Sequence, residues 1–330
     1  MKAQLTLIVT LVLTSPLHAA DGPGELNNWG RWGDDDQKGA ANYITAKQIV
    51  KAARLIKSGE MFSLAIPIAA DGPVHPSRIS PQHIMTGTGT DYVAGQPPAV
   101  GRMKFADDYI YMPLQGSTQW DGLSHAWYGD TLYNGVTEAA IRTAPANGGA
   151  TKLGIENVAT SLVGRGVLID VLTHKGGKLP VGYEITRADI EATVKAQKTS
   201  VKEGDLVLLR TGVVPDYYRL TDPIERATFM VAPQAGIGLD VVDWIADHRI
   251  AGIAADNVAL EVLPNPDPTK TLEVHGALLR DLGVYMGEIW WLEELAADCQ
   301  DDGRFEFFLA AQPLNVPGAV GAPLNPIAIK

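Results

Sequence analysis

The sequence predicts a single α/β domain, and three observations support this class. Of the 330 residues, 46% are hydrophobic and 20% are charged, which is the balance of a soluble globular protein. Short apolar runs typical of buried strands alternate along the chain with amphipathic stretches typical of helices. After the first twenty residues, no repeat, low-complexity tract or break in composition divides the chain. We therefore expect one domain over residues 21–330.

Helices are expected where a capping residue precedes apolar residues at helical spacing. Thr45 and Thr186 are such caps, and Gly59 is placed to end the first helix. In the second helix, Ile190 and Val194 are spaced to face a core. The predicted helices cover residues 46–57, 186–197 and 238–250, with a short helix between His275 and Val284.

Strands are expected at the short apolar runs between these helices. Several of them are uninterrupted by polar residues, as in strands buried on both faces of a sheet. Residues 71–101 are instead rich in Pro, Gly, Ser and Thr, and we expect a long loop there. The predicted strands lie within residues 61–70, 109–112, 164–174, 203–212, 251–260, 284–288 and 303–315.

The charge balance excludes two classes of partner. The formal net charge is −11, and no cluster of Lys and Arg appears in the sequence. Binding to nucleic acid needs a basic face, and docking on anionic lipid needs one too. A small-molecule substrate is the partner that this composition leaves open.

The first twenty residues, MKAQLTLIVTLVLTSPLHAA, are typical of a signal peptide. Lys2 supplies the positive start, an apolar run follows, and Ala19 and Ala20 provide small residues for cleavage. A buried strand or a retained anchor is the alternative. We expect export, with a periplasmic or secreted mature chain and no membrane segment after cleavage.

The single cysteine limits what export could add to stability. Cys299 has no second cysteine with which to form an intramolecular disulfide. No histidine lies near it in sequence, so a packed or exposed thiol is a better interpretation than a nucleophile.

The stretch "QGSTQWDGLSH", residues 115–125, gathers amides, hydroxyls, a carboxylate and an imidazole around one tryptophan. Asp121 can bind a metal or orient a base, and His125 can be a ligand or a general base. A polar loop with an Asp-to-backbone turn is the alternative.

A second pair of candidates lies about 150 residues further on. His275 precedes an apolar helix, and Glu288 ends an apolar strand. A carboxylate inside such a run is expected to be buried, so it needs a cation or a set of hydrogen bonds. A metal is one such cation, and a salt bridge to Arg210 is the alternative.

Other chemistries lack their motifs. The chain has no GxSxG, HExxH, CxxC or P-loop pattern. The glycines of "GTGTDYVAG", residues 87–95, do not have dinucleotide spacing, which disfavours nicotinamide binding.

Five segments together resemble the cyclase superfamily, which includes bacterial kynurenine formamidase and isatin hydrolase. They occur in the family order and cover most of the mature chain. They are "RWGDDDQKGAANYIT", "QGSTQWDGLSH", "GRGVLIDV", "EGDLVLLRTG" and the segment from His275 to Glu288. The resemblance implies a compact swivelling β/β/α domain, with a barrel-like mixed sheet surrounded by helices. It also implies a homo-oligomer, either a dimer or a tetramer.

The resemblance implies a bound divalent metal, Mn or Zn, and hydrolysis of amides or cyclic amides. The family pattern H-x-G-T-H-x-D-x-P-x-H aligns with residues 115–125, where Thr118, Asp121 and His125 match. On this alignment Asp121, His275 and Glu288 are metal ligands, and His125 is the acid/base.

The departures from the pattern alter the expected metal content. Gln115 and Gln119 replace the two leading histidines, and Ser117 replaces a glycine. A carboxamide oxygen is a weaker ligand than imidazole for Zn or Mn, so one of two family sites should be weak or empty. One metal is expected, with Gln119 either adding an oxygen ligand or binding the substrate carbonyl.

The sequence thus favours a metal-dependent hydrolase of a small amide, cyclic amide, lactone or arylformamide. Two alternatives stay open: a metal-free acid/base enzyme of the lyase or isomerase type, and a periplasmic small-molecule binding protein on a degraded enzyme frame. The residues expected to contact substrate are Gln115, Ser117, Gln119, Trp120 and Trp32, with Tyr128 or Tyr133 as further aromatic walls.

Overall fold

The computed structural model describes residues 22, 24–98, 100–143 and 148–330. The predicted signal peptide, residues 1–20, lies outside the described residues. Within the described ranges, no helix combines the length and the apolar character needed to cross a bilayer.

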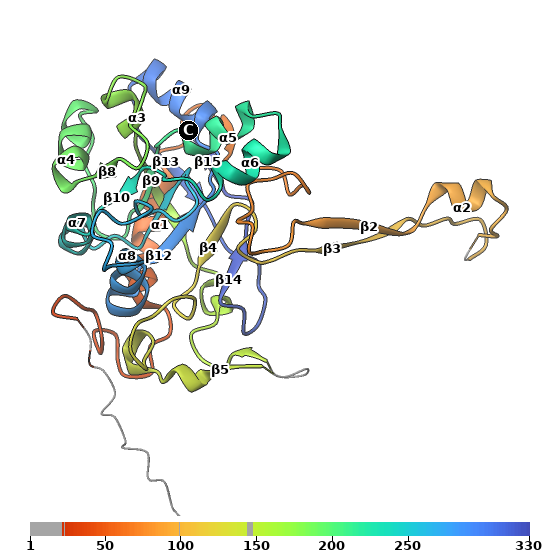
Figure 1. Ribbon diagram of the computed structural model, residues 1–330, viewed down its shortest axis with the longest axis horizontal. Helices are drawn as coiled ribbons and strands as arrows, with labels where there is room; N and C mark the ends of the chain where they lie inside the picture. Colours follow the sequence, from red (N-terminus) through yellow and green to blue (C-terminus); the bar gives the residue numbers. More distant parts are fainter. Residues whose placement is uncertain (1–21, 23, 99, 144–147) are drawn as a thin grey trace, which may run out of the picture.

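One curled sheet of nine strands organises the domain, in the order β1-β15-β13-β7-β9-β11-β12-β4-β14 (Figure 1). Its four central strands run parallel: β7 (Val163–Ile169), β9 (Leu206–Leu209), β11 (Gly252–Ala255) and β12 (Tyr285–Glu288). Antiparallel strands extend it on both sides: β13 (Glu306–Ala310), β15 (Ile327–Ile329) and β1 (Met61–Ser63) beyond β7, and β4 (Gln119–Asp121) and β14 (Gly321–Pro323) beyond β12. The predicted α/β class with a mixed, barrel-like sheet is confirmed.

Helices surround this sheet (Figure 1). They are α1 (Ala46–Ala53), α3 (Val171–His174), α4 (Arg187–Ala196), α5 (Val213–Arg219), α6 (Pro223–Phe229), α7 (Asp240–His248), α8 (Glu273–His275), the π-helix η5 (Gly276–Leu282) and α9 (Glu293–Asp302). Short 3-10 turns are η1 (Gly39–Tyr43), η2 (Tyr133–Gly135), η3 (Glu138–Ala140) and η4 (Ile155–Val158). Two-residue strands pair β5 (Ile141–Arg142) with β6 (Gly149–Ala150), and β8 (Glu184–Ile185) with β10 (Gly236–Ile237).

The predicted helix caps are present. Thr45 and Thr186 each accept a hydrogen bond from the third residue of their helix, and that residue's side chain accepts one in return. The first helix ends at Ala53, four residues earlier than predicted. Helices α5, α6 and α9 and strands β14 and β15 were not predicted from the sequence.

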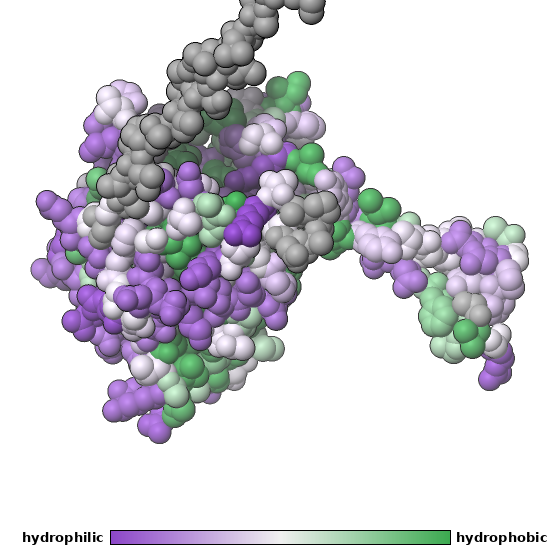
Figure 2. All heavy atoms as spheres, turned by 90° about the horizontal axis from the view of Figure 1, so that it is seen from below, coloured by the Kyte–Doolittle hydropathy of each residue, from purple (hydrophilic) through white to green (hydrophobic). Residues whose placement is uncertain are grey.

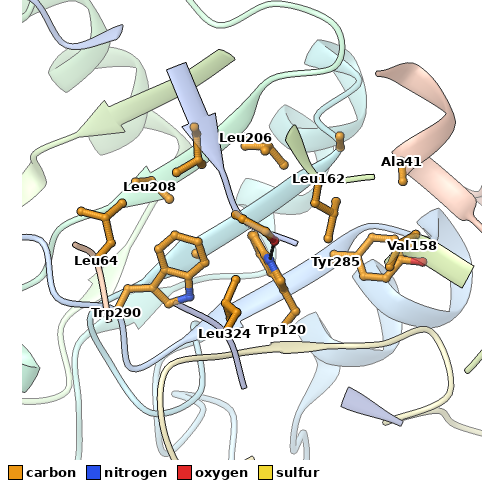
Figure 3. Close-up of a cluster of buried hydrophobic side chains, with 14 of the residues drawn as sticks. Ala41, Leu64, Trp120, Val158, Leu162, Leu206, Leu208, Tyr285, Trp290 and Leu324 are labelled. Atoms are coloured by element: carbon orange, nitrogen blue, oxygen red, sulfur yellow. Dashed lines mark hydrogen bonds between the residues drawn. The ribbon is translucent and has the colours of Figure 1, made fainter. Parts of the chain in front are cut away.

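Side-chain alternation along the parallel strands builds one apolar core on each face of the sheet. In β9, Leu206 and Leu208 belong to one core, whereas Val207 and Leu209 belong to the other. The first core also holds Trp120 and Trp290, whose rings meet edge to face at 5.0 Å between centroids (Figure 3). Both strand faces are therefore buried, as the uninterrupted apolar runs predicted.

Residues 71–101 are not the single long loop that we predicted. Strand β2 (Gln82–Gly87) pairs with β3 (Asp107–Tyr111) to form a two-stranded ribbon, and helix α2 (Gly89–Val93) lies near its tip. This ribbon projects far from the domain (Figure 1). The strand predicted at 109–112 is therefore one of the two strands of this ribbon.

Two glycines in β7 give a matched test of the core packing. A Cβ at Gly166 would lie 2.2 Å from a ring carbon of Phe307, whereas one at Gly164 meets its nearest neighbour, Ile44, at 3.7 Å. We expect Gly166→Ala to lower the free energy of unfolding by about 1–3 kcal/mol because the packed ring must move. Gly164→Ala should leave it unchanged or raise it slightly, since alanine costs less backbone entropy than glycine. Urea denaturation of both variants measures the difference, and equal effects would contradict this packing.

Candidate functional site

Strand β4 places the central residues of the 115–125 stretch. It lies between β12 and β14, with Gln119 opposite Glu288 and Asp121 opposite Met286. Because side chains alternate across a strand, Gln119 and Asp121 share one face while Trp120 enters the core on the other. Of these three consecutive residues, Gln119 and Asp121 therefore belong to the site and Trp120 belongs to the core.

Asp121, His275 and Glu288 form a buried cluster. Each offers one donor atom, and these three atoms lie within 4.8 Å of one another. His275 Nε2 is 3.4 Å from Glu288 Oε1, and Gln119 donates its amide hydrogen to Glu288 Oε2 at 2.6 Å. The side chain of Asp121 is fully buried, and those of His275 and Glu288 are nearly so. The structure therefore brings together the three residues predicted to be ligands.

Glu261 is a fourth member that the sequence analysis missed. Its carboxylate accepts a hydrogen bond from His275 Nδ1 and also accepts the backbone N–H of His275 at 3.2 Å. With Nδ1 donating to Glu261, the lone pair of Nε2 points toward Glu288 and Asp121. Metal-binding histidines are usually oriented in this way by a carboxylate. The available signal was an acidic residue inside the apolar run "ALEVL", the same signal that identified Glu288.

Hydrogen bonds from Asn257 and Thr118 fix the backbone around the cluster. Ile289, directly after Glu288, has a φ of +60°, which is unfavourable for a β-branched residue. Its N–H is accepted by the carbonyl of Asn257, and its carbonyl accepts the hydroxyl of Thr118 at 2.6 Å. The Asn257 side chain also accepts the N–H of Leu260, next to Glu261. Asn257 therefore connects, through hydrogen bonds, the segment that carries Glu261 to the segment that carries Glu288.

The electrostatics of the cluster favour bound positive charge. Burial raises the pKa of Asp121 to about 6, against the lowering effect of His125. For His275, burial lowers the pKa, but hydrogen bonds to Glu261 and Glu288 outweigh it and raise the pKa to about 10. The same carboxylates that hold a proton on this imidazole would attract a metal cation in its place.

The buried atoms without partners fit a divalent metal. Both carboxylate oxygens of Asp121 and Oε1 of Gln119 have no hydrogen-bond donor, although buried acceptors normally have one. One imidazole, two carboxylates and an amide oxygen form a donor set that suits Mn or Zn. Gly321 leaves room beside this set, because a Cβ there would lie 3.4 Å from Asp121 Oδ1.

His125 lies at the boundary between the cluster and solvent. Its Nε2 is 3.7 Å from Asp121 Oδ1, and its side chain is 22% exposed. It borders a cavity of about 310 Å³, which also reaches Gly276 beside His275. The lining residues are His125, Ala126, Trp127, Tyr128, Thr271, Leu272, Glu273 and Gly276. This position suits a group that exchanges protons with a ligand in the cavity.

Tyr128 forms a fixed wall of this cavity. Its hydroxyl donates to Asp281, and the guanidinium of Arg280 lies over its ring, 4.1 Å from the centroid. The ring also packs so closely on Gly276 that a Cβ there would lie 2.6 Å from it. The expectation that Tyr128 lines the pocket agrees with this geometry, and Trp127 is an aromatic wall that we had not predicted.

Several residues predicted to contact substrate are placed elsewhere. Trp120 is fully buried and donates its indole N–H to the carbonyl of Ala311, so its assignment to the pocket is wrong. Tyr133 is also buried in the core. Trp32 packs edge-on against Tyr43, 4.9 Å between centroids, and does not line the cavity beside His125.

Ser117 and Gln115, both predicted to contact substrate, differ in burial, because Gln115 is only half-buried. Ser117 is buried. Nε2 of Gln115 is buried without a partner and lies 2.8 Å from the place of a Cβ on Gly321, close to Asp121. Gln115 therefore borders the cluster without entering it.

Two alternatives from the sequence have clear outcomes. Arg210 pairs with Asp170 and Glu293, so it is not the partner of Glu288. Cys299 is buried, and burial raises its pKa to about 12, which is unfavourable for a nucleophile. A larger cavity of about 590 Å³ lies beside Arg210 and contains none of the cluster residues.

Comparison with known proteins places this geometry among cyclases. The cyclase family model matches residues 62–262, about three fifths of the chain. A crystal structure described as a novel cyclase is 64% identical, with 93% of this chain and 100% of that chain covered and a TM-score of 0.88. No match was found among the curated proteins.

More distant solved structures share the fold. Isatin hydrolase A from Labrenzia aggregata, bound to benzyl benzoate, is 19% identical over 86% of this chain and 97% of that chain, with a TM-score of 0.58. An isatin hydrolase bound to the product analogue thioisatinate is 15% identical over 86% and 98%, with a TM-score of 0.56.

The contact between Glu261 and His275 yields a testable prediction. Glu261→Gln should weaken Mn or Zn binding by roughly 10–100-fold, because a neutral amide orients the imidazole less firmly and makes it less basic. Glu60→Gln, at an exposed glutamate far from the cluster in sequence, is the control. Isothermal titration calorimetry on metal-stripped protein measures both, and unchanged affinity in Glu261→Gln would remove Glu261 from the site.

Proposed function

The chain belongs to the cyclase family, and from this premise we propose that it is a metal-dependent hydrolase of small amides, cyclic amides, lactones or arylformamides. One observation carries the proposal: the carboxylate of Asp121 is fully buried, and neither of its oxygens has a hydrogen-bond donor. One of these oxygens lies within 4.8 Å of a donor atom of His275 and of Glu288, close enough for the three to bind one metal ion. A buried charge is paired or binds a metal.

The metal would be held by Asp121, His275 and Glu288, with Gln119 Oε1 as a further oxygen donor. When bound, a divalent metal supplies Lewis-acid chemistry by polarising a carbonyl and lowering the pKa of water. The chain supplies the orientation: Glu261 fixes the His275 ring, and the amide of Gln119 fixes Glu288.

His125 is the proposed general acid/base. It faces the cavity beside Asp121, where its Nε2 can accept a proton from an attacking water and return it to the leaving nitrogen or oxygen. Asp121 Oδ1 lies 3.7 Å from this nitrogen, so the carboxylate is placed to orient the imidazole ring. The imidazole is partly exposed and can therefore exchange its proton with solvent between turnovers.

The proposed substrate class is based on the size and lining of the cavity beside His125 and on the substrates for which relatives of the same fold are named. About 310 Å³ is room for a small molecule, and Trp127 and Tyr128 give it aromatic walls. The two isatin hydrolases that share the fold are named for one cyclic amide, isatin. A panel of cyclic amides, arylformamides and lactones is therefore the rational first screen.

Gln115 and Gln119 favour one metal per chain. Gln119 donates its amide N–H to Glu288, and Nε2 of Gln115 is buried without a hydrogen-bond partner; an amide nitrogen has no free lone pair for a metal. The two histidines that would complete a second site in the family pattern are therefore replaced by amides, whose oxygens are weaker ligands for Zn or Mn than imidazole nitrogens.

Metal content tests this proposal. We expect elemental analysis of the purified protein to give one Mn or Zn per chain, and chelation to abolish turnover that the same metal restores. Two tightly bound metals per chain would contradict the single site. Turnover that survives complete metal removal would instead support a metal-free acid/base enzyme.

His125→Ala separates proton transfer from metal binding. We expect kcat to fall by roughly 10²–10⁴-fold, the usual contribution of general acid/base catalysis, with metal stoichiometry unchanged. His75→Ala, at an exposed histidine in another segment, is the control. Near-normal turnover of His125→Ala on the best substrate of the panel would exclude the assigned role.

A further inference from the structure

Glu273 gives the wall of the cavity beside His125 its negative charge. Among the described residues that line this cavity, Glu273 is the only acidic one, and none is a lysine or an arginine. Glu273 is half-buried, and within the described part of the chain its carboxylate takes part in no hydrogen bond or ion pair. Lys270, the nearest lysine in sequence, is exposed and lies outside the wall. An unpaired charge in a partly closed cavity is a group that can bind a ligand of opposite charge.

The capping of helix α8 explains why this carboxylate is free. The helix begins at Glu273, directly after Leu272, whose φ of +56° turns the chain into the helix. An acidic side chain in a first turn is usually stabilised by the free N–H groups of that turn. In this helix the carboxylate of Glu261 accepts the N–H of Val274, at 3.4 Å, and that of His275, at 3.2 Å. Because Glu261 occupies these donors, the side chain of Glu273 is left facing the cavity.

Aromatic rings in the same wall add attraction for a cation. Trp127 and Tyr128 both line the cavity, and their polar atoms are already engaged: the indole N–H donates to Glu138 at 3.1 Å, and the phenol donates to Asp281. What remains for a ligand is ring surface, and aromatic ring faces attract ammonium groups. Arg280 lies over Tyr128, 4.1 Å from its centroid, whereas no cation of the described residues lies over Trp127. A free carboxylate and a free indole in one small cavity suit an organic ammonium ion.

The charge of Glu273 persists when the metal cluster is filled. The buried group whose donor atoms converge consists of Asp121, His275 and Glu288 and does not include Glu273. A divalent metal would offset the carboxylates of that cluster and leave Glu273 unpaired. Figure 2 shows a largely hydrophilic face of the body, and the chain as a whole has a formal net charge of −11. A small cation therefore meets an attractive potential as it approaches, and an anion meets a repulsive one.

The same wall disfavours a carboxylate on the substrate. A carboxylate needs a cationic partner, and among the described lining residues only His125 can become one, by taking a proton. That imidazole is assigned to proton transfer at the reacting carbonyl. A carboxylate elsewhere in the cavity would lie near Glu273 and would lose its hydration without compensation. The cavity therefore discriminates by charge, for an amine and against an acid.

We propose that this cavity selects substrates that carry an organic ammonium group and no carboxylate, with Glu273 as the residue that binds the ammonium. The substrate is then a small amide or lactone with a protonated amine on the part that does not react. This inference rests on the proposed function, because it takes the cavity beside His125 as the substrate site. It adds a residue that decides which amide or lactone is accepted, a choice that the metal cluster does not make.

Calorimetric titration with two probes of similar shape tests the ammonium site without any turnover. Benzylammonium and benzyl alcohol match in size and differ in charge. We expect the wild type to bind benzylammonium roughly 10-fold more tightly, the lower range for a hydrogen bond to a charged group, since Glu273 is only half-buried. Glu273→Gln should bring the two affinities together, because the amide has no charge.

Two further variants control this measurement. Glu273→Asp keeps a carboxylate and should retain part of the preference for benzylammonium. Glu60→Gln, at an exposed glutamate outside the cavity, should retain all of it. Equal affinities for the two probes in the wild type, or a preference for benzylammonium that survives in Glu273→Gln, would overturn the proposal.

A matched pair of substrates extends the test to catalysis. We expect para-aminomethyl formanilide to exceed formanilide in kcat/KM by roughly 10-fold, through a lower KM, and Glu273→Gln to bring this ratio close to one. The ratio cancels any general effect of the substitution on folding or metal content. Turnover of formanilide with no gain from the amine would overturn the ammonium site and leave the hydrolase function intact. A calorimetric preference for benzylammonium that is lost in Glu273→Gln, with no turnover of either formanilide, would support the ammonium site and contradict the hydrolase function.

Discussion

Three buried carboxylates surround one imidazole, and most of the local structure can be understood from this charge arrangement. Asp121, Glu261 and Glu288 are each at most 4% exposed, and His275 lies among them. Burying a carboxylate without a partner costs several kcal/mol, so this group is stable only with bound positive charge. A proton on His275 supplies one charge, and a divalent metal would supply two. The cluster is therefore both the most costly part of the core and the part best suited to bind a cation.

The fold holds these charges in place through strand register. Pairing of β4 with β12 sets Gln119 beside Glu288, and alternation sends Trp120 to the opposite face, into the core around Trp290. The apolar side of β4 thus stabilises the strand that carries the polar side. At the end of β12, Asn257 and Thr118 hold the unfavourable backbone of Ile289. Strain and buried polar groups coincide here, as they commonly do at functional sites.

The sequence predicted the parts of this arrangement that have strong local signals. Uninterrupted apolar runs identified the parallel strands, and Thr45 and Thr186 identified two helix starts. Trp120 was misassigned because no strand was predicted over residues 119–121, and the alternation of side chains along a strand would have turned the indole away from the site. Glu261 was missed although it lies in an apolar run like that of Glu288, since its role depends on a contact with His275 across 14 residues. A strand was predicted at 109–112, but its partner β2 was missed because the ribbon faces no core, so β2 lacks the alternation of apolar and polar residues that reveals a half-buried strand.

The central claim is that the cluster of Asp121, His275 and Glu288 binds one divalent metal. The most direct test is anomalous X-ray diffraction from crystals of the protein grown with Mn or Zn, with data collected on both sides of the metal absorption edge. The account predicts one strong anomalous peak per chain, in contact with Asp121, His275 and Glu288 and with no peak coordinated by Gln115. An absent peak at the cluster in metal-soaked crystals, or a second peak of equal strength bound by Gln115, would contradict it.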